Sequence, residues 1–130
     1  MIRLKIEHIA IYTNDLECLR RFYQTYFDGT VGQPYENPNT GLRTYFLTFA
    51  DGARLELMTR PVLEQGARAD WTAGWAHLAF QAGGREAVDA LTQRLRADGY
   101  VVASEPRVTG DGYYESCVRD PDGNMIEITA

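Results

Sequence analysis

Glu7-His8-Ile9-Ala10-Ile11, near the start of the 130-residue chain, returns in the second half as Ala76-His77-Leu78-Ala79-Phe80. A second stretch is also repeated, since Asp51-Gly52-Ala53-Arg54-Leu55-Glu56-Leu57 returns as Asp122-Gly123-Asn124-Met125-Ile126-Glu127-Ile128. Each half therefore opens on a strand-like run with one of the chain's two histidines and closes on a strand-like run with a glutamate. Such an internal repeat indicates two copies of one supersecondary module.

Two histidines and two glutamates stand at equivalent positions of the repeat: His8 and Glu56 in the first copy, His77 and Glu127 in the second. Alternate residues of a strand face the same side, and the apolar neighbours of each glutamate require the opposite side. A single histidine or glutamate on a strand is more often a solvent-facing polar residue. Two equivalent pairs instead indicate a divalent metal site, and we predict His8, Glu56, His77 and Glu127 as its ligands.

The donor atoms of this set narrow the choice of ion. Imidazole nitrogen and carboxylate oxygen suit one divalent cation per site, Zn²⁺ or Ni²⁺ first and Co²⁺ or Mn²⁺ as alternatives, whereas Ca²⁺ takes more oxygens. Four protein ligands in a six-coordinate shell leave positions for water or substrate, which is typical of a catalytic site.

The composition excludes several classes of function. A formal charge of −5 and a single lysine, Lys5, argue against nucleic acid as the main partner. No stretch approaches the roughly 20 apolar residues that span a bilayer, so no membrane partner is expected. Residues 1–7 alternate apolar and charged side chains and are read as a strand, not as a signal peptide. Cys18 and Cys117 have no motif, and we expect reduced thiols in a cytoplasmic protein.

The expected fold class is α+β. The chain is read as a single domain, 1–130, with module 1 at about 1–60 and module 2 at about 74–130. Each βαβββ module is expected to have its helix outside, and two such modules form a half-open barrel. In module 1 we predict strands over 2–12, 42–49 and 54–58, a short strand near Val31, and a helix capped by Asn14 or Asp15 that ends at Gly29. In module 2 we predict strands over 75–81, 100–104, 113–119 and 125–129 and a helix over 85–98.

Three further side chains are candidates for substrate binding. Tyr12 and Arg54 share the strand faces of His8 and Glu56, and Tyr113 is at the expected mouth of the cleft. Only one of Tyr113 and Tyr114 can face outward. An arginine beside the metal favours an anionic substrate, although Arg54 is equally suited to partner a glutamate.

The repeated stretches resemble the vicinal oxygen chelate superfamily, which includes glyoxalase I, fosfomycin-resistance and bleomycin-resistance proteins and extradiol dioxygenases. The resemblance rests on residues 7–11, 54–57, 74–80 and 120–128, and covers nearly the whole chain. It implies paired βαβββ modules, a metal in the cleft, a small-molecule substrate with adjacent oxygens, and a homodimer. A His-Glu-His-Glu set resembles that of glyoxalase I, which implies a glyoxalase-type lyase or isomerase.

The resemblance also implies a mechanism in which a ligand glutamate takes a proton from the substrate, with Glu127 as first choice and Glu56 as second. Glyoxalase I proteins commonly hold glutathione with an arginine and an asparagine four residues after the first histidine and glutamate. This chain has Tyr12 and Arg60 there, so glutathione is not implied. Other hypotheses are a fosfomycin-resistance-like epoxide-opening enzyme, a module that sequesters a small molecule, and, last, a ring-cleaving dioxygenase.

Overall fold

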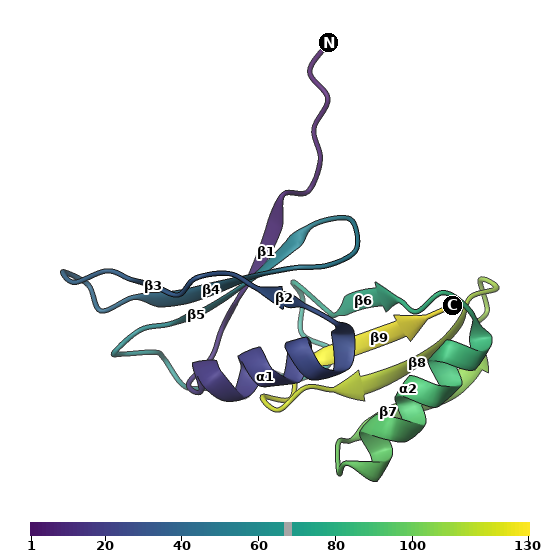
Figure 1. Cartoon of the computed structure of the whole chain (residues 1–130). Coiled ribbons are helices and arrows are strands. Elements are labelled where there is room, and N and C mark those ends of the chain that lie inside the picture. The colour runs from purple at the N-terminus through teal and green to yellow at the C-terminus, as the bar shows by residue number, and fades with distance from the viewer. Residues whose placement is uncertain (67–68) are drawn as a thin grey trace. The chain divides into compact units, whose positions relative to one another are not determined.

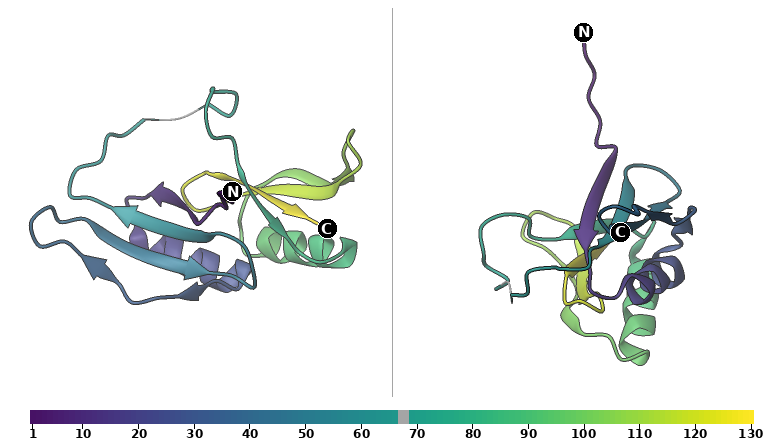
Figure 2. Two further views of the ribbon diagram at one scale, coloured as in Figure 1. Left: turned by 90° about the horizontal axis from the view of Figure 1, so that it is seen from above. Right: turned by 90° about the vertical axis from the view of Figure 1, so that its left-hand side faces the viewer.

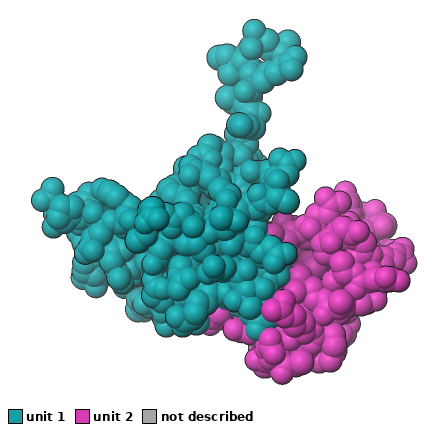
Figure 3. All heavy atoms as spheres, viewed as in Figure 1, with its two compact units in different colours: residues 1–65 teal, residues 66–130 magenta. Residues whose placement is uncertain are grey.

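The computed structural model describes residues 1–66 and 69–130, and it divides into two compact units, residues 1–65 and residues 66–130 (Figures 1 and 3). Each unit contains one sheet and one helix. The order strand, helix, strands recurs in both units, so the expected α+β class and the βαβββ modules are confirmed.

Unit 1 contains a sheet of five strands and one helix. The sheet has the order β1-β5-β4-β2, with β1 parallel to β5, β4 antiparallel to β5, and β3 paired with β4. The elements are β1 (His8–Tyr12), α1 (Leu16–Phe27), β2 (Thr30–Val31), β3 (Tyr35–Glu36), β4 (Arg43–Thr48) and β5 (Arg54–Thr59).

The core of unit 1 lies between α1 and one face of this sheet. The apolar stripe of α1 buries Leu19, Phe22 and Tyr23, and the strands bury Leu55 and Leu57. Figure 2 shows the helix running along one side of the sheet. Because Leu55 and Leu57 point to the helix, the residue between them must point to the opposite face.

The ends of α1 follow local chemistry. Asp15 is the N-cap, and its carboxylate accepts a hydrogen bond from the Cys18 backbone N–H at 3.0 Å. The left-handed residue that ends the helix is Asp28, with φ 54°, and not the predicted Gly29. Gly29 is needed for space instead, since a Cβ there would lie 2.7 Å from a methyl carbon of Leu47.

Unit 2 repeats the topology with four strands. Its sheet has the order β6-β9-β8-β7, with β6 parallel to β9 and the other pairs antiparallel. Val88 and Leu95 of the helix are fully buried, as are Ile126 and Ile128 of the last strand. The elements are β6 (Leu78–Gln81), α2 (Arg85–Ala97), β7 (Val102–Val108), β8 (Tyr114–Arg119) and β9 (Met125–Thr129).

The prediction that the first strand begins at Ile2 is wrong. Residues 1–7 form no strand and extend away from the body of unit 1 (Figure 1), with Ile2 86% and Leu4 91% exposed. The neighbouring strand explains this difference. β5 begins at Arg54, opposite His8, and the turn at Gly52, with φ 83°, leaves no strand to pair with the earlier residues.

Replacing a core leucine of β5 tests this packing. Leu55 is 2% exposed, so Leu55→Ala is expected to lower the free energy of unfolding by about 2–5 kcal/mol through lost burial and a residual cavity. Val62→Ala is the matched control, because Val62 is 83% exposed and its loss should change stability by less than about 0.5 kcal/mol. Urea denaturation followed by circular dichroism measures both, and equal effects would contradict the described core.

Candidate metal centre

Unit 1 brings the first predicted pair of ligands together. His8 opens β1 and Glu56 lies in the middle of β5, whose register places Arg54 opposite His8 and Glu56 opposite Ala10. The Nε2 atom of His8 lies 3.8 Å from a carboxylate oxygen of Glu56. The His8 side chain is 41% exposed and that of Glu56 17%, so the pair lies at the surface of the sheet face opposite α1.

Unit 2 brings the second pair together in the same way. His77 comes directly before β6, and Glu127 lies in the middle of β9. The Nε2 atom of His77 lies 3.1 Å from a carboxylate oxygen of Glu127, with side-chain exposures of 42% and 18%. The buried neighbours Ile126 and Ile128 hold Glu127 on the face opposite α2.

The spacing of the donor atoms in each pair can be compared with that around an ion. Imidazole nitrogen and carboxylate oxygen bind Zn²⁺ at about 2.0–2.2 Å, so two neighbouring ligands of one ion lie about 3.0–3.4 Å apart. The pair in unit 2 meets this spacing, and the pair in unit 1 needs a shift of about half an ångström. Among residues 1–66 and 69–130, no three histidine, cysteine, aspartate or glutamate side chains are grouped closely enough to hold a metal ion. Each pair by itself therefore offers two donor atoms, one nitrogen and one oxygen.

Arg54 forms an ion pair with Glu7, a residue that was not predicted as part of the site. Its guanidinium makes two hydrogen bonds to the Glu7 carboxylate, one of them from Nε at 2.9 Å. Chiefly through these bonds, Arg54 lowers the pKa of the Glu7 carboxyl to about 2. Arg54 thus partners a glutamate, the alternative that its sequence position left open. The only indication in the sequence that Glu7 belongs to this site is that it directly precedes His8.

Tyr12 and Arg60 contact each other. Tyr12 ends β1, is 50% exposed, and accepts a hydrogen bond from Nε of Arg60 at 3.2 Å. Alternation along β1 places Tyr12 on the same face as His8. The two residues that stand where glyoxalase I proteins commonly have arginine and asparagine therefore form one polar pair in unit 1.

A second carboxylate stands beside Glu127 in unit 2. Burial raises the pKa of Glu115 on β8, and the neighbouring charge of Glu127 and a hydrogen bond to it raise the pKa further. Cys117, opposite Glu127 in the strand register, is 8% exposed, and burial raises the pKa of its thiol. The thiol is therefore a poor nucleophile at neutral pH. Glu115 is not among the residues predicted from the sequence, although it is two positions from Cys117 on β8 and therefore faces the same side of the sheet.

The two neighbouring tyrosines divide as expected. Tyr113 is 59% exposed and lies just before β8. The hydroxyl of Tyr114 donates to Asp89, and the guanidinium of Arg85 lies 4.8 Å from its ring, which places Tyr114 against α2. Tyr113 is therefore the one that remains available to a ligand.

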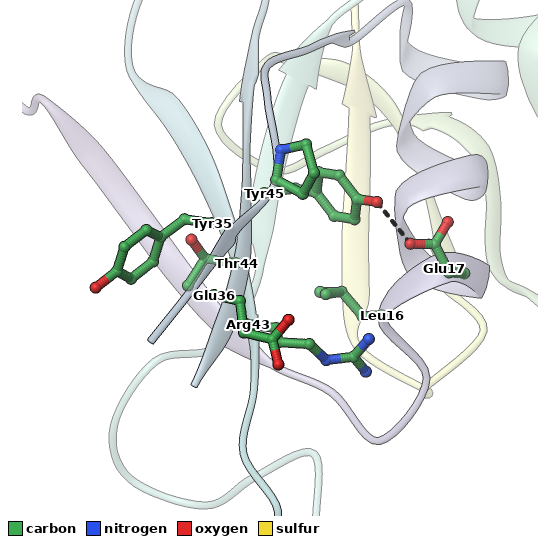
Figure 4. Close-up of a pocket in the computed structure, with 8 residues that line it drawn as sticks. Leu16, Glu17, Tyr35, Glu36, Arg43, Thr44 and Tyr45 are labelled. Carbon is green, nitrogen blue, oxygen red and sulfur yellow. Dashed lines mark hydrogen bonds between the residues drawn. The ribbon is translucent and has the colours of Figure 1, made fainter. Parts of the chain in front are cut away.

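A cavity of about 230 Å³ lies elsewhere in unit 1, between the start of α1 and strands β3 and β4 (Figure 4). Tyr45 and Glu17 both line it, and the Tyr45 hydroxyl donates to the Glu17 carboxylate at 2.7 Å, as the dashed line shows. Arg43 and Glu36 line it from neighbouring strands. None of the predicted site residues lines this cavity, so it does not coincide with the histidine–glutamate pair.

In the described part of the chain, neither helix has the length and apolar character that crossing a bilayer requires.

Comparison with known proteins agrees with this architecture. The uncharacterized protein YqjT of Bacillus subtilis (strain 168) is 30% identical over 132 residues, which cover 96% of this chain and 98% of YqjT. A possible glyoxalase from Bacillus cereus has a TM-score of 0.72 at 26% identity, over 98% of this chain and 100% of that chain.

Glyoxalase I from Zea mays has a TM-score of 0.78 at 21% identity, which shows a shared fold alone. The match covers 96% of this chain and 44% of the maize chain, so this chain spans less than half of that protein. The model of the Glyoxalase/Bleomycin resistance protein/Dioxygenase superfamily matches residues 5–128. Because the match takes in both halves of the repeat, the chain belongs to the Glyoxalase/Bleomycin resistance protein/Dioxygenase superfamily.

Proposed function

We propose that this protein is a metal-dependent lyase or isomerase of the glyoxalase type. His8, Glu56, His77 and Glu127 would bind one divalent cation, with Zn²⁺ or Ni²⁺ first and Co²⁺ or Mn²⁺ as alternatives. The observation that carries the proposal is the pairing of an imidazole Nε2 with a carboxylate oxygen on the helix-free face of each unit. Two such pairs provide the donors that these ions prefer.

The proposed substrate is a small molecule with two adjacent oxygens, and a bound cation would supply Lewis acidity to the carbonyl group. A carboxylate of the chain would accept the proton next to that carbonyl and, in an isomerisation, return it to the neighbouring carbon. Glu127 is the proposed acceptor and Glu56 the second choice. Unit 2 also has a second carboxylate beside the proposed acceptor, because burial and the charge of Glu127 raise the pKa of Glu115.

Substrate choice is proposed to lie with Tyr12, Arg54 and Tyr113. Tyr12 and Tyr113 present exposed phenol groups, one in each unit. Arg54 is bound to the ionised Glu7, so it would contribute as part of a fixed ion pair near the first histidine and not as a free cation. The adduct of a thiol with a 2-oxoaldehyde is the first substrate class to test, with several thiols in place of glutathione alone.

Removal of one proposed ligand tests metal binding. We expect calorimetric titration of wild type with Zn²⁺ or Ni²⁺ to show one ion per ligand set. His77→Ala should lower the affinity by more than about 100-fold, since even outer partners of metal ligands contribute 10- to 100-fold. Glu36→Gln is the control, because Glu36 is an exposed carboxylate on β3 that belongs to neither pair. Full affinity in His77→Ala would show that the ligand assignment is wrong.

Metal removal should also be visible in stability. At a free metal concentration 100 times its dissociation constant, the folded protein is expected to gain about 2.7 kcal/mol over the chelated protein. Urea denaturation with and without chelator measures this gain. If none of the four ions binds to or stabilises the wild-type protein, the result supports the alternative hypothesis, a module that sequesters a small molecule, and contradicts the metal-dependent enzyme.

The choice of proton acceptor has its own test. Glu127→Gln is expected to lower kcat for hemithioacetal isomerisation by about 10²- to 10⁴-fold, the usual contribution of a general base. The matched variant Glu56→Gln should mainly weaken metal binding, with smaller loss of kcat at saturating metal. The reverse ranking would assign the base to unit 1.

Glu115 predicts a pH dependence of stability. A raised pKa in the folded state means that the folded chain binds this proton more readily than the unfolded chain. Its stabilising effect is complete below the ordinary carboxyl pKa and is lost as pH rises through the folded-state value. Glu115→Gln is therefore expected to be more stable than wild type at neutral pH and to lose this advantage near pH 4. Denaturation curves of both proteins, recorded with chelator at several pH values, measure the difference in their free energies of unfolding. A difference that does not change with pH would contradict the prediction.

The proposal includes a cytoplasmic homodimer. The thiols of Cys18 and Cys117 are free, which suits a reducing compartment. Light scattering during size-exclusion chromatography should give twice the mass of the 130-residue chain, and a monomer mass at micromolar concentration would remove this part of the proposal.

A further inference from the structure

We propose that Glu7 is a positioning residue that fixes the tautomer and the orientation of His8, with the proton on Nδ1 and the lone pair on Nε2. This inference rests on the proposed function, since it assigns Nε2 to the cation. A neutral imidazole has one donor nitrogen and one acceptor nitrogen, and the hydrogen bond made by one decides what the other can bind.

The two ring nitrogens of His8 face two different carboxylates. Nδ1 lies 3.4 Å from a carboxylate oxygen of Glu7, whereas Nε2 lies 3.8 Å from one of Glu56. A proton on Nδ1 has the nearer acceptor, which leaves the Nε2 lone pair directed to the side of Glu56. The tautomer that suits a metal ligand is therefore the one that Glu7 stabilises before any ion is bound.

Glu7 is held firmly enough for this role. The Arg54 guanidinium donates two hydrogen bonds to its carboxylate, and the Arg54 backbone N–H donates to its carbonyl oxygen at 2.9 Å. The strand register places Arg54 directly opposite His8. Glu7 therefore has little freedom to turn away from the imidazole, although its side chain is 54% exposed.

Phe46 on β4 contacts both His8 and Arg54, and with Glu7 these residues form the assembly that surrounds the imidazole. The guanidinium of Arg54 lies 4.0 Å from the centre of the Phe46 ring, and the His8 ring meets the same ring edge-on at 5.4 Å and 84°. A cation over an aromatic face and an edge-to-face ring pair are both favourable contacts. Phe46 thereby restricts rotation of both the imidazole and the group that holds Glu7.

Unit 2 lacks this assembly at the equivalent positions of the repeat. Ala76 stands for Glu7, and Met125 stands for Arg54. Cys117 is opposite Glu127, as Phe46 is opposite Glu56. The two histidines therefore have the same proposed role and different support, which makes His77 an internal reference for His8.

The tautomer can be measured directly, without metal and without an activity assay. Long-range ¹H–¹⁵N spectra of protein with labelled histidine should be recorded with chelator at about pH 8.5, two units above the ordinary imidazole pKa of about 6.5. Wild type should show the His8 proton on Nδ1. In Glu7→Ala, His8 should shift to a mixture dominated by the Nε2 proton, while His77 keeps its wild-type signals.

A proton on Nε2 of His8 in wild type would overturn the inference, and so would identical His8 signals in wild type and Glu7→Ala. Glu7→Ala removes an exposed side chain, and circular dichroism verifies its fold. Phe46→Leu keeps Glu7 and Arg54 and provides a second variant, in which His8 should keep its tautomer with a broadened signal.

Metal affinity provides the second readout. Glu7→Ala should bind Zn²⁺ about 10- to 100-fold more weakly than wild type, the range found for carboxylates behind a metal-bound histidine. Glu36→Ala removes the same charge elsewhere in unit 1 and should stay within about twofold. If Glu7→Ala binds Zn²⁺ as tightly as the control Glu36→Ala, the inference that Glu7 supports metal binding through His8 is overturned. If wild type binds no ion but the tautomer shifts as described, Glu7 does orient His8 and the proposed function fails instead.

Discussion

The alternation of side chains along the last strand of each unit is the constraint on which the rest of the structure depends. Leu55 and Leu57 pack under α1, and Ile126 and Ile128 pack under α2, so a shift of register by one residue would bury a glutamate in each core. Burying an unpaired carboxylate costs far more than any local rearrangement could recover. Core packing therefore fixes Glu56 and Glu127 on the faces where the histidines lie.

The two units carry the same pair of donor residues, one histidine and one glutamate, but different side chains surround each pair. In unit 1 the pair is backed by Glu7, Arg54 and Phe46, which hold a ring and a charge in place. In unit 2 the equivalent positions of the repeat carry Ala76 and Met125, and a second carboxylate, Glu115, stands beside Glu127. This difference suits the proposed roles of the two glutamates, in which Glu127 is the first choice as proton acceptor and Glu56 the second.

The sequence predicted those parts that depend on periodicity and repetition. Both helices and the closing strand of each module follow from apolar spacing, and the structure places them accordingly. Prediction from the sequence failed where the structure of a segment depends on which strand or side chain lies beside it. Residues 1–7 alternate like a strand, yet the turn before Arg54 leaves them without a partner. The partner of Arg54 and the carboxylate beside Glu127 depend on cross-strand contacts that one-dimensional spacing leaves open. A single sequence likewise carries no information on which thiol or anion the substrate contains.

X-ray absorption at the metal edge tests the central claim, that the four side chains share one cation. The account predicts a spectrum of the Zn²⁺- or Ni²⁺-loaded protein with two imidazole ligands, identified by their outer-shell scattering, oxygen donors for the remainder, and first-shell distances of about 2.0–2.2 Å. A sulfur ligand at about 2.3 Å, or a shell with one imidazole or none, would contradict it.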